Sequence, residues 1–172
     1  MDDEPELQSR RDIYREIDSN PGIHFRELLR ELDYAQGTLQ YQLRQLEDEG
    51  LVEVSDDGDY TRYYASGSFK SEDKAVMNAL RREYSRRIIG HLADEGALST
   101  SDLSERIDKS RSTISWHLSR LEEEDVVEKE REGRSVLYSL KEPDKIRRLY
   151  TVHRKSFSDR LVDKMLGLWE GY

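Results

Sequence analysis

The chain has 172 residues, of which 35% are hydrophobic and 38% charged, and its formal net charge is −9. This length suits one average domain or two small ones, and the absence of cysteine excludes disulfides and any thiolate metal site. No apolar run approaches the roughly 20 residues that a membrane-spanning helix needs, and the acidic first residues do not resemble a signal peptide. We therefore expect a cytoplasmic protein with no membrane partner.

The excess negative charge lies in the first part of the chain. Residues 1–70 hold 8 basic and 17 acidic side chains, whereas residues 71–172 hold 20 of each. This balance argues against simple phosphate binding by the first part, because nucleic-acid-binding surfaces are basic. Arginines outnumber lysines 20 to 8. Many acids with few lysines suggest a halophilic origin, in which salt screens the repulsion between acidic groups. A stability curve against KCl tests this hypothesis.

A repeat with an offset of 75 residues indicates two copies of one small domain. The segment Gly37–Glu53 aligns without a gap with Ser112–Glu128, and seven of these 17 positions are identical. The match extends outward in the same register, to Arg11 over Arg86 and to Tyr63 over Tyr138. We expect a first domain at residues 1–70, a second at 71–141 and a C-terminal helix, a candidate dimerisation element, at 142–172.

Each copy predicts three helices followed by a two-stranded hairpin. In chain order we expect helices at about 9–19, 25–33 and 36–49, strands at about 51–55 and 60–65, helices at about 82–94, 100–107 and 111–124, and strands at about 126–131 and 134–140. Asp57–Gly58 and Glu132–Gly133 mark the hairpin turns. The segment 71–81 is expected to extend or precede the first helix of the second copy. This order of elements is that of a winged helix-turn-helix domain, in which the hairpin is the wing.

Two helix starts in the second copy carry capping signals. Ser99 and Asp102 have the spacing of a capping box. Ser110 is a good N-cap for the third helix, whereas its counterpart Ala35 is not.

The C-terminal segment 143–169 predicts one long helix. Pro143 suits a helix start, and apolar residues recur at three- and four-residue steps from Ile146 to Leu168. Basic residues occupy much of the remaining surface. We expect the apolar stripe to pack on the chain's own domains or on a second copy, with a homodimer as the favoured outcome. The expected fold class is mainly α with small β-hairpin wings, as two tandem winged helix-turn-helix domains plus a C-terminal helix.

The third helix of each copy has an apolar face and an outward face. A helical wheel places Leu39, Leu43 and Leu46 on the core face of the first copy, and Ile114, Leu118 and Leu121 on that of the second. Tyr41 and Trp116 then point outward. An outward aromatic residue either packs on a neighbouring wing or partner domain, or contacts a nucleic-acid groove. Both interpretations remain open, although the Ser, Thr, Gln and Arg neighbours are residue types that reach bases and phosphates.

The two wings differ in charge. The second wing, Glu130–Ser135, contains arginines that can hold a phosphate or enter a minor groove. The first wing, Ser55–Asp59, repels phosphate, and Arg62 is the main cation near it. The second copy is therefore the stronger candidate for DNA contact. The first copy binds a protein, or binds DNA only when salt screens its charge.

Enzyme chemistry finds little support in the sequence. There is no glycine-rich phosphate loop, no metal-ligand spacing and no Ser-His-Asp pattern. We expect neither catalysis nor a metal or cofactor, and we interpret His91 and His117 as packing residues.

Several motifs resemble known regulators. Asn20–Leu28 followed by Gly37–Leu43 resembles winged-helix regulators common in archaea, of the ArsR- and MarR-like kind. Arg111–Leu118 resembles the recognition helix, and Glu132–Tyr138 the wing, of the arsenical-repressor-like (ArsR) family. The resemblance implies sequence-specific binding of double-stranded DNA and control of transcription. It places Ser112, Thr113, Ser115, Trp116 and Arg134 near DNA, with Thr38, Gln40, Tyr41 and Arg44 as their first-copy equivalents.

These observations predict a DNA-binding transcriptional regulator whose partner is double-stranded DNA. The candidate DNA-contacting residues are Thr38, Gln40, Tyr41, Arg44, Arg62, Arg111, Ser112, Thr113, Ser115, Trp116, Arg120 and Arg134. The alternative is a tandem winged-helix protein–protein interaction module of the transcription or chromosome machinery, with little direct DNA binding. The acidic first domain and the two outward aromatic residues fit that alternative.

Overall fold

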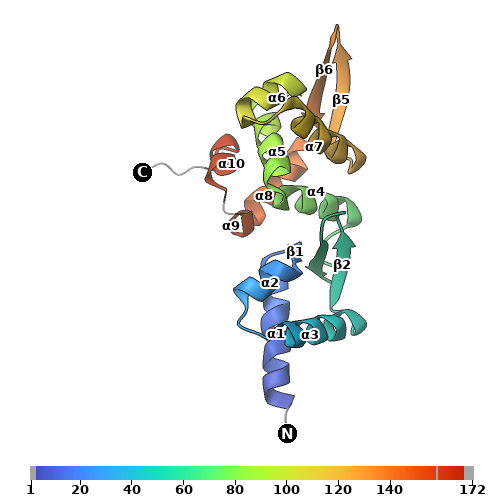
Figure 1. Ribbon diagram of the computed structural model, residues 1–172, viewed down its shortest axis with the longest axis vertical. Coiled ribbons are helices and arrows are strands. Elements are labelled where there is room, and N and C mark those ends of the chain that lie inside the picture. Colours follow the sequence, from blue (N-terminus) through green and yellow to red (C-terminus); the bar gives the residue numbers. More distant parts are fainter. Residues whose placement is uncertain (1–2, 158, 169–172) are drawn as a thin grey trace. The chain divides into compact units, whose positions relative to one another are not determined.

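The structure of the chain, a computed structural model, describes residues 3–157 and 159–168 (Figure 1). It divides into two compact units, Met1–Lys74 and Ala75–Tyr172, which we call the first and second units. The elements of the first unit are α1 (Asp3–Ser19), β1 (Ile23–His24), α2 (Phe25–Glu31), α3 (Gln36–Asp48), β2 (Val52–Asp56) and β3 (Thr61–Ala65). Helix α4 (Ser71–Arg81) begins in the first unit and ends in the second. The second unit continues with α5 (Glu83–Glu95), β4 (Leu98–Ser99), α6 (Thr100–Ile107), α7 (Arg111–Glu123), β5 (Val127–Glu132), β6 (Ser135–Leu140), α8 (Pro143–Val152), α9 (Arg154–Phe157) and α10 (Arg160–Met165).

The first unit is built around one apolar core. The core residues lie at helical spacing on α1 and α3 and on the adjoining short elements: Ile13, Ile17, Ile23, Leu28, Leu39, Leu43, Leu46 and Val52. The i, i+4 spacing of the two α1 isoleucines puts both on the face that meets α3. The antiparallel sheet has the strand order β1-β3-β2, and its β2–β3 hairpin forms the first wing.

The second unit repeats this architecture in the same register. Its sheet has the order β4-β6-β5, and the pair Leu98–Tyr138 stands 75 residues after the pair Ile23–Tyr63. Helix α7 likewise begins and ends 75 residues after α3. The β5–β6 hairpin extends beyond the helices of its own unit (Figure 1). The predicted three helices and hairpin are therefore present in each unit. The two-residue strands β1 and β4, which add a third strand to each sheet, were missed because they are too short to show a pattern.

Local capping fixes the helix starts of the second unit. The Ser99 hydroxyl accepts a hydrogen bond from the Asp102 N–H, and the Asp102 carboxylate accepts one from the Ser99 N–H, which confirms the capping box. Ser110 accepts from the Thr113 N–H at the start of α7, whereas Ala35 offers no side-chain cap to α3. Both predictions of capping are confirmed.

The segment before α5 forms a separate helix. Helix α4 ends at Arg81, and the extended backbone of Arg82 (φ −87°, ψ 124°) separates it from α5. Helix α4 therefore precedes the first helix of the second copy and does not extend it.

The prediction of one long C-terminal helix is wrong. The segment is divided into α8, α9 and α10, with a break at His153 and another at Asp159, whose backbone is extended and whose side chain caps α10 through the Val162 N–H. The breaks let the apolar stripe fold back within the second unit, where its large side chains Ile146, Tyr150, Phe157 and Leu166 are buried. The Tyr150 hydroxyl donates to Asp163 Oδ1 at 2.7 Å and fixes α8 to α10. Residues 169–172, the end of the predicted helix, lie outside the described part of the chain.

Candidate functional site

Helix α7 presents an uncharged polar and aromatic surface. Ile114, Leu118 and Leu121 are fully buried, as predicted, so the opposite face of the helix turns outward. Trp116 is 57% exposed on that face, and its exposed neighbours are Ser112, Ser115 and Ser119. The helix has no acidic residue before Glu122, which is unusual in a chain with so many carboxylates. The N-terminal part of α7 can therefore approach a polyanion without meeting a carboxylate on the helix.

The start of α7 is held rigidly. Besides capping the helix, the Ser110 hydroxyl lies 2.9 Å from the Thr113 hydroxyl and 3.1 Å from the Ser112 hydroxyl. Thr113 is half-buried by this arrangement, whereas Arg111 is exposed and takes part in no ion pair among the described residues. The uncapped N–H groups and the helix dipole add a positive potential at this end, which favours an anion such as a phosphate.

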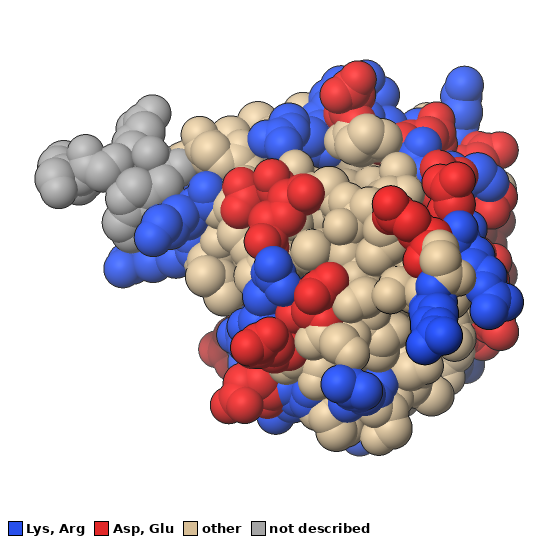
Figure 2. Space-filling view, turned by 90° about the horizontal axis from the view of Figure 1, so that it is seen from above, with Lys and Arg blue, Asp and Glu red and all other residues tan. Residues whose placement is uncertain are grey.

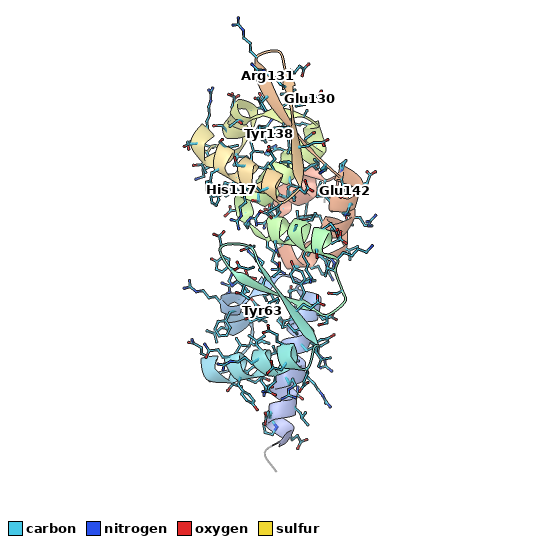
Figure 3. The ribbon with its side chains drawn as sticks, turned by 90° about the vertical axis from the view of Figure 1, so that its right-hand side faces the viewer. Tyr63, His117, Glu130, Arg131, Tyr138 and Glu142 are labelled. Carbon is cyan, nitrogen blue, oxygen red and sulfur yellow. The ribbon has the colours of Figure 1, made fainter. Side chains whose placement is uncertain are left out.

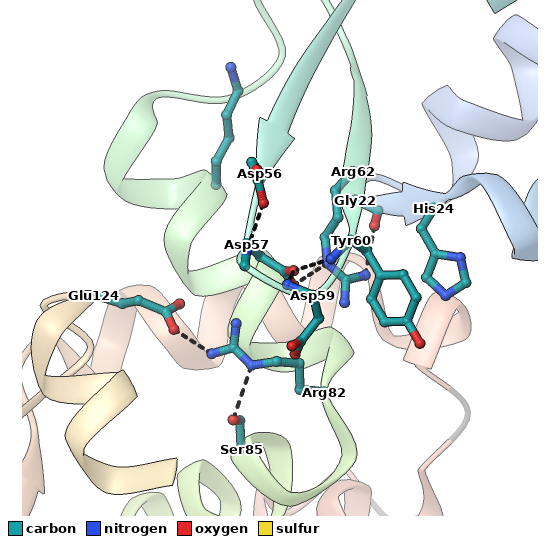
Figure 4. Close-up of polar contacts among 12 residues, drawn as sticks. Gly22, His24, Asp56, Asp57, Asp59, Tyr60, Arg62, Arg82, Ser85 and Glu124 are labelled. Carbon is teal, nitrogen blue, oxygen red and sulfur yellow. Dashed lines mark hydrogen bonds and ion pairs between the residues drawn. The ribbon is translucent and has the colours of Figure 1, made fainter. Parts of the chain in front are cut away.

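Arg120 supports the exposed tryptophan. Its guanidinium carbon lies 5.6 Å from the centre of the Trp116 ring, and its Nε lies 3.3 Å from Glu124 Oε1. Glu124 is also bound by buried Arg82, at 2.6 Å (Figure 4). This network connects the end of α7 to the start of α5. Because its side chain is only 14% exposed, Arg120 positions Trp116 and is poorly placed to bind a phosphate directly.

The second wing carries arginines at its tip. Arg131 and Arg134 are both exposed, and the Arg131 Nε donates to the Gly133 carbonyl oxygen at 3.3 Å. Figure 3 shows Arg131 and Glu130 near the tip of the hairpin. Gly133 has a φ of 61°, which the two-residue turn between β5 and β6 requires. The tip thus combines cations with the carboxylates of Glu130 and Glu132, so its positive potential is local.

Helix α3 of the first unit presents an equivalent outward face. Tyr41 is 49% exposed, and Thr38, Gln40 and Arg44 are exposed beside it. The first acidic residue of α3 is Glu47. Tyr41 and Trp116 therefore both point away from the core, as predicted.

A polar groove runs between α3 and the first wing. Its volume is about 960 Å³, and Gln40 and Arg44 line one side of it, with Asp59 and Tyr60 of the wing on the other. Arg26, exposed in the first turn of α2, also lines the groove. Arg26 was not among the predicted contact residues, because its place beside the wing depends on the sheet pairing of β1 with β3. The groove combines cations with carboxylates and is less suited to a phosphate than the face of α7.

Arg62 is not available to DNA, which corrects the prediction made from its position near the first wing. Its side chain is 2% exposed, and its Nε donates to Asp57 Oδ2 at 2.5 Å. A second hydrogen bond, of 3.0 Å, joins its Nη1 to the Gly22 carbonyl oxygen (Figure 4). The guanidinium thereby connects the turn of the wing to the start of β1. Arg62 is therefore a structural residue of the first unit and not part of the candidate interface.

Asp57 is part of the same buried pair. Its side chain is 1% exposed and also accepts hydrogen bonds from the N–H groups of Asp59 and Tyr60. Burial by itself raises the pKa of the Asp57 carboxyl, but the hydrogen bonds from Arg62 and from the turn outweigh this effect and leave the pKa below its ordinary value. This acidic residue of the first wing therefore organises the turn.

The surface charges are mixed on the face seen in Figure 2. Basic and acidic side chains alternate there around an uncharged area. Of the histidines singled out from the sequence, His91 lies 3.4 Å from Glu95 and His117 packs against Tyr84 and Trp116. Within residues 3–157 and 159–168, no group of three or more His, Cys, Asp or Glu side chains is arranged to hold a metal ion. No helix in these ranges has the length and apolar character needed to cross a membrane.

Comparison with known proteins matches both units to protein families. Residues 7–77 match a family described as an N-terminal HTH domain, and residues 81–128 match one described as winged helix-turn-helix DNA-binding. A curated relative from Methanocaldococcus jannaschii, described as an uncharacterized HTH-type transcriptional regulator, is 28% identical over 144 residues. That match covers 83% of this chain and 36% of the relative, so the chain spans about a third of that protein's length.

Solved structures with similar folds include two bacterial proteins. HlyU from Vibrio cholerae N16961 is 27% identical, with a TM-score of 0.44 over 49% of this chain and 91% of that one. The homodimeric winged helix-turn-helix DNA-binding domain of Mb0332 from Mycobacterium bovis, a possible ArsR-family transcriptional regulator, is 22% identical. Its TM-score is 0.43, over 59% of this chain and 87% of that one.

Proposed function

We propose that this chain, which carries two helix-turn-helix domains in tandem, is a DNA-binding transcriptional regulator without catalytic activity. The observation that carries the proposal is the outward face of α7, which is rigidly capped, free of acidic residues before Glu122 and next to a wing with exposed arginines. The match of residues 81–128 to a winged helix-turn-helix DNA-binding family supports the same assignment.

In the proposed complex, the N-terminal part of α7 enters the major groove of double-stranded DNA. Ser112 and Ser115 can donate or accept hydrogen bonds at base edges, and the Trp116 ring can contact a thymine methyl group or the sugar-phosphate backbone. Arg111 and Arg134 neutralise phosphates and set the orientation of the helix. Thr113 and Arg120 act by holding the cap and the tryptophan.

The first unit has a weaker role in DNA contact in this proposal. Thr38, Gln40, Tyr41 and Arg44 form the equivalent exposed face, but the net charge of residues 1–70 is −9. Contact by this face therefore requires salt that screens the acidic groups. This condition fits the proposed halophilic, cytoplasmic setting. If the setting is right, the midpoint of thermal unfolding of this chain should rise with KCl concentration.

A homodimer formed through the C-terminal segment has little apolar surface to use. The large exposed apolar side chains of that segment, within the described residues, are Val152 and Leu161. Analytical ultracentrifugation of the full chain with and without DNA measures the oligomeric state directly. A dimer would present four third helices, whereas a monomer presents two.

The test is a titration of the full chain into labelled duplex DNA at several KCl concentrations, followed by fluorescence anisotropy. Genomic fragments around the protein's own gene are included beside random duplexes. We expect the logarithm of the binding constant to fall linearly with log[KCl], with a slope of about −0.9 for each phosphate neutralised.

Matched variants assign the contact to the second unit. Arg134→Ala and Arg111→Ala should each reduce the magnitude of the slope by about 0.9. Arg30→Ala removes the same charge from an exposed position on α2 and should leave the slope unchanged. No binding at any KCl concentration at which the chain is folded would refute the proposal.

That negative result would favour the second candidate function, a protein–protein interaction module of the transcription machinery. The specific observation behind this candidate is the acidic first unit, whose exposed wing-tip residues include Asp56 and Asp59.

A further inference from the structure

The same face of the first repeat helix is covered in the second unit and open in the first. In the second unit, α10 packs on α5. Met165 and Val162 of α10 approach Gly90, and the Arg86 Nε donates to Asp159 Oδ2 at 2.8 Å. This face of α5 is thus covered by a short helix that brings apolar side chains and one acidic group.

The equivalent face of α1 in the first unit is an open groove. Its volume is about 390 Å³, and its apolar lining consists of Leu7, Tyr14, Leu46 and Leu51. Leu7 and Leu51 are 47% and 45% exposed. Covering these two side chains would be favourable, because it removes apolar surface from water. The repeat register places Tyr14 over Ile89 and Leu46 over Leu121. These apolar positions of the two faces therefore correspond, but a helix of the same unit packs on α5 and none of the described helices of the first unit covers the groove on α1.

The rim of this groove is basic in an otherwise acidic unit. Arg10, Arg11 and Arg15 line it, which is three of the 8 basic residues in residues 1–70. Arg10 is held by Glu49 at 2.9 Å. Arg11 and Arg15 are exposed, and no ion pair within the described residues involves either of them. Arg11 occupies the repeat position of Arg86, which in the second unit binds a carboxylate.

One position shows how the occupants of the two faces must differ. A Cβ atom at Gly90 would lie 2.6 Å from the Met165 Cε, so α10 places the flexible end of a methionine where α5 has no side chain. The first unit has Arg15 at this position. A helix seated on α1 needs a small or acidic side chain where α10 has Met165. The occupant is therefore more acidic than α10.

We infer that the groove between α1 and the end of α3 is a docking site for a short, acidic, amphipathic helix of a partner protein. Its apolar side chains would cover Leu7, Tyr14 and Leu51, and its carboxylates would bind Arg11 and Arg15. The inference goes beyond DNA binding and does not depend on it, because the groove contains none of the residues proposed to contact DNA.

The experiment uses a labelled peptide with the sequence of residues 157–168, in which Met165→Glu supplies the carboxylate expected to face Arg15. A peptide of this length is marginally helical in water, so binding is followed by NMR of the full-length, isotope-labelled chain as well as by anisotropy. We expect saturable binding, with shifts of the Leu7, Arg11 and Leu51 amide signals. The peptide with the unchanged Met165 should bind more weakly, and so should one that carries Asp159→Asn.

Variants of the chain distinguish binding at this groove from non-specific electrostatic attraction of the peptide. Arg11→Glu and Arg15→Glu should each weaken binding of the Met165→Glu peptide at least tenfold. Arg30→Glu, which makes the same charge change elsewhere on the first unit, should not. Leu51→Ala should weaken binding without unfolding the chain, because that side chain is already half exposed.

Two results would overturn the inference. One is the absence of saturable binding, or binding that Arg11→Glu leaves unchanged. The other is a chain that sediments as a dimer and becomes a monomer on Leu51→Asp substitution, which would make a second copy the occupant. Loss of DNA binding in the titration described above would not affect either measurement, so the two proposals fail independently.

Discussion

Replacing Asp57 with Asn should destabilise the first unit strongly, although the residue lies in a surface hairpin. The substitution keeps the shape of the side chain, and the Asn oxygen can still accept from the Tyr60 and Asp59 N–H groups. It removes the carboxylate opposite a guanidinium that is 2% exposed. Removing one partner of a buried ion pair costs about 3–5 kcal/mol. Because the Gly22 carbonyl still accepts from Arg62 at 3.0 Å, we expect the lower end, about 3 kcal/mol, or roughly a 150-fold increase in local opening.

Amide hydrogen exchange of the full chain measures this change. The strand amides that pair β1 and β2 with β3 report the opening of the first unit, and those of β4–β6 serve as an internal reference for the second. The contribution should also depend on pH. Since the pKa of Asp57 is lowered in the folded chain, its stabilisation is present above the ordinary carboxyl pKa and is lost as pH falls through the folded value.

Two control variants test whether the Asp57–Arg62 pair stabilises the first wing. Glu132 occupies the repeat position of Asp57 but is exposed. Glu132→Gln should therefore change the free energy of opening of the second unit by no more than about 0.5 kcal/mol. The double variant Asp57→Asn with Arg62→Met removes both charges and should recover much of the lost stability. A single variant as stable as wild type, or a double variant no better than the single, would show that the pair does not hold the wing.

Three further predictions concern the second unit and its repeat partner. Trp116→Ala should weaken duplex binding by about 2 kcal/mol, roughly 30-fold in Kd. It should leave the salt slope and the thermal midpoint unchanged because the side chain is uncharged and 57% exposed; an unchanged Kd would contradict the proposed contact. Ser110→Ala should lower the stability of the second unit by about 1 kcal/mol through loss of the α7 cap, and Ala35→Ser should stabilise α3 by up to a similar amount. Hydrogen exchange of the first-turn amides should become faster in the first variant and slower in the second, and unchanged rates would contradict the prediction. Gly90→Arg, which installs the residue of the first unit, should displace α10 and raise trypsin cleavage between residues 154 and 168 roughly tenfold. Gly90→Ala should have little effect, since only the flexible end of Met165 must move, and equal cleavage in both variants would contradict the role of this position.

The repeat made most of the helical framework predictable. The spacing of Leu39, Leu43 and Leu46, and of their counterparts in α7, identified the buried faces, and the serine caps identified where α6 and α7 begin. The matches to two helix-turn-helix families confirm the tandem architecture. These features are local, so a pattern of a few residues is enough to specify them.

Features that depend on distant contacts were not predictable in the same way. The burial of Arg62 requires the pairing of β1 with β3, and an arginine in a short strand has no local sign of burial. The repeat did contain a clue, because Leu137 occupies the same position in β6. The breaks around His153 and Asp159 were hidden by a regular apolar stripe, which is equally consistent with one long helix and with several packed short ones. The residues proposed to contact DNA remain predictions.

The cover that α10 provides over α5 affects how the second unit can be divided. A fragment ending at Lys141 would contain every element that the two repeats share, and a boundary chosen by sequence repetition alone would fall there. Such a fragment would leave Gly90 without the Val162 and Met165 side chains beside it, and Arg86 without Asp159. It would therefore expose an apolar face of α5 that α10 covers in the full chain. Self-association of the fragment through that face would say nothing about the oligomeric state of the protein.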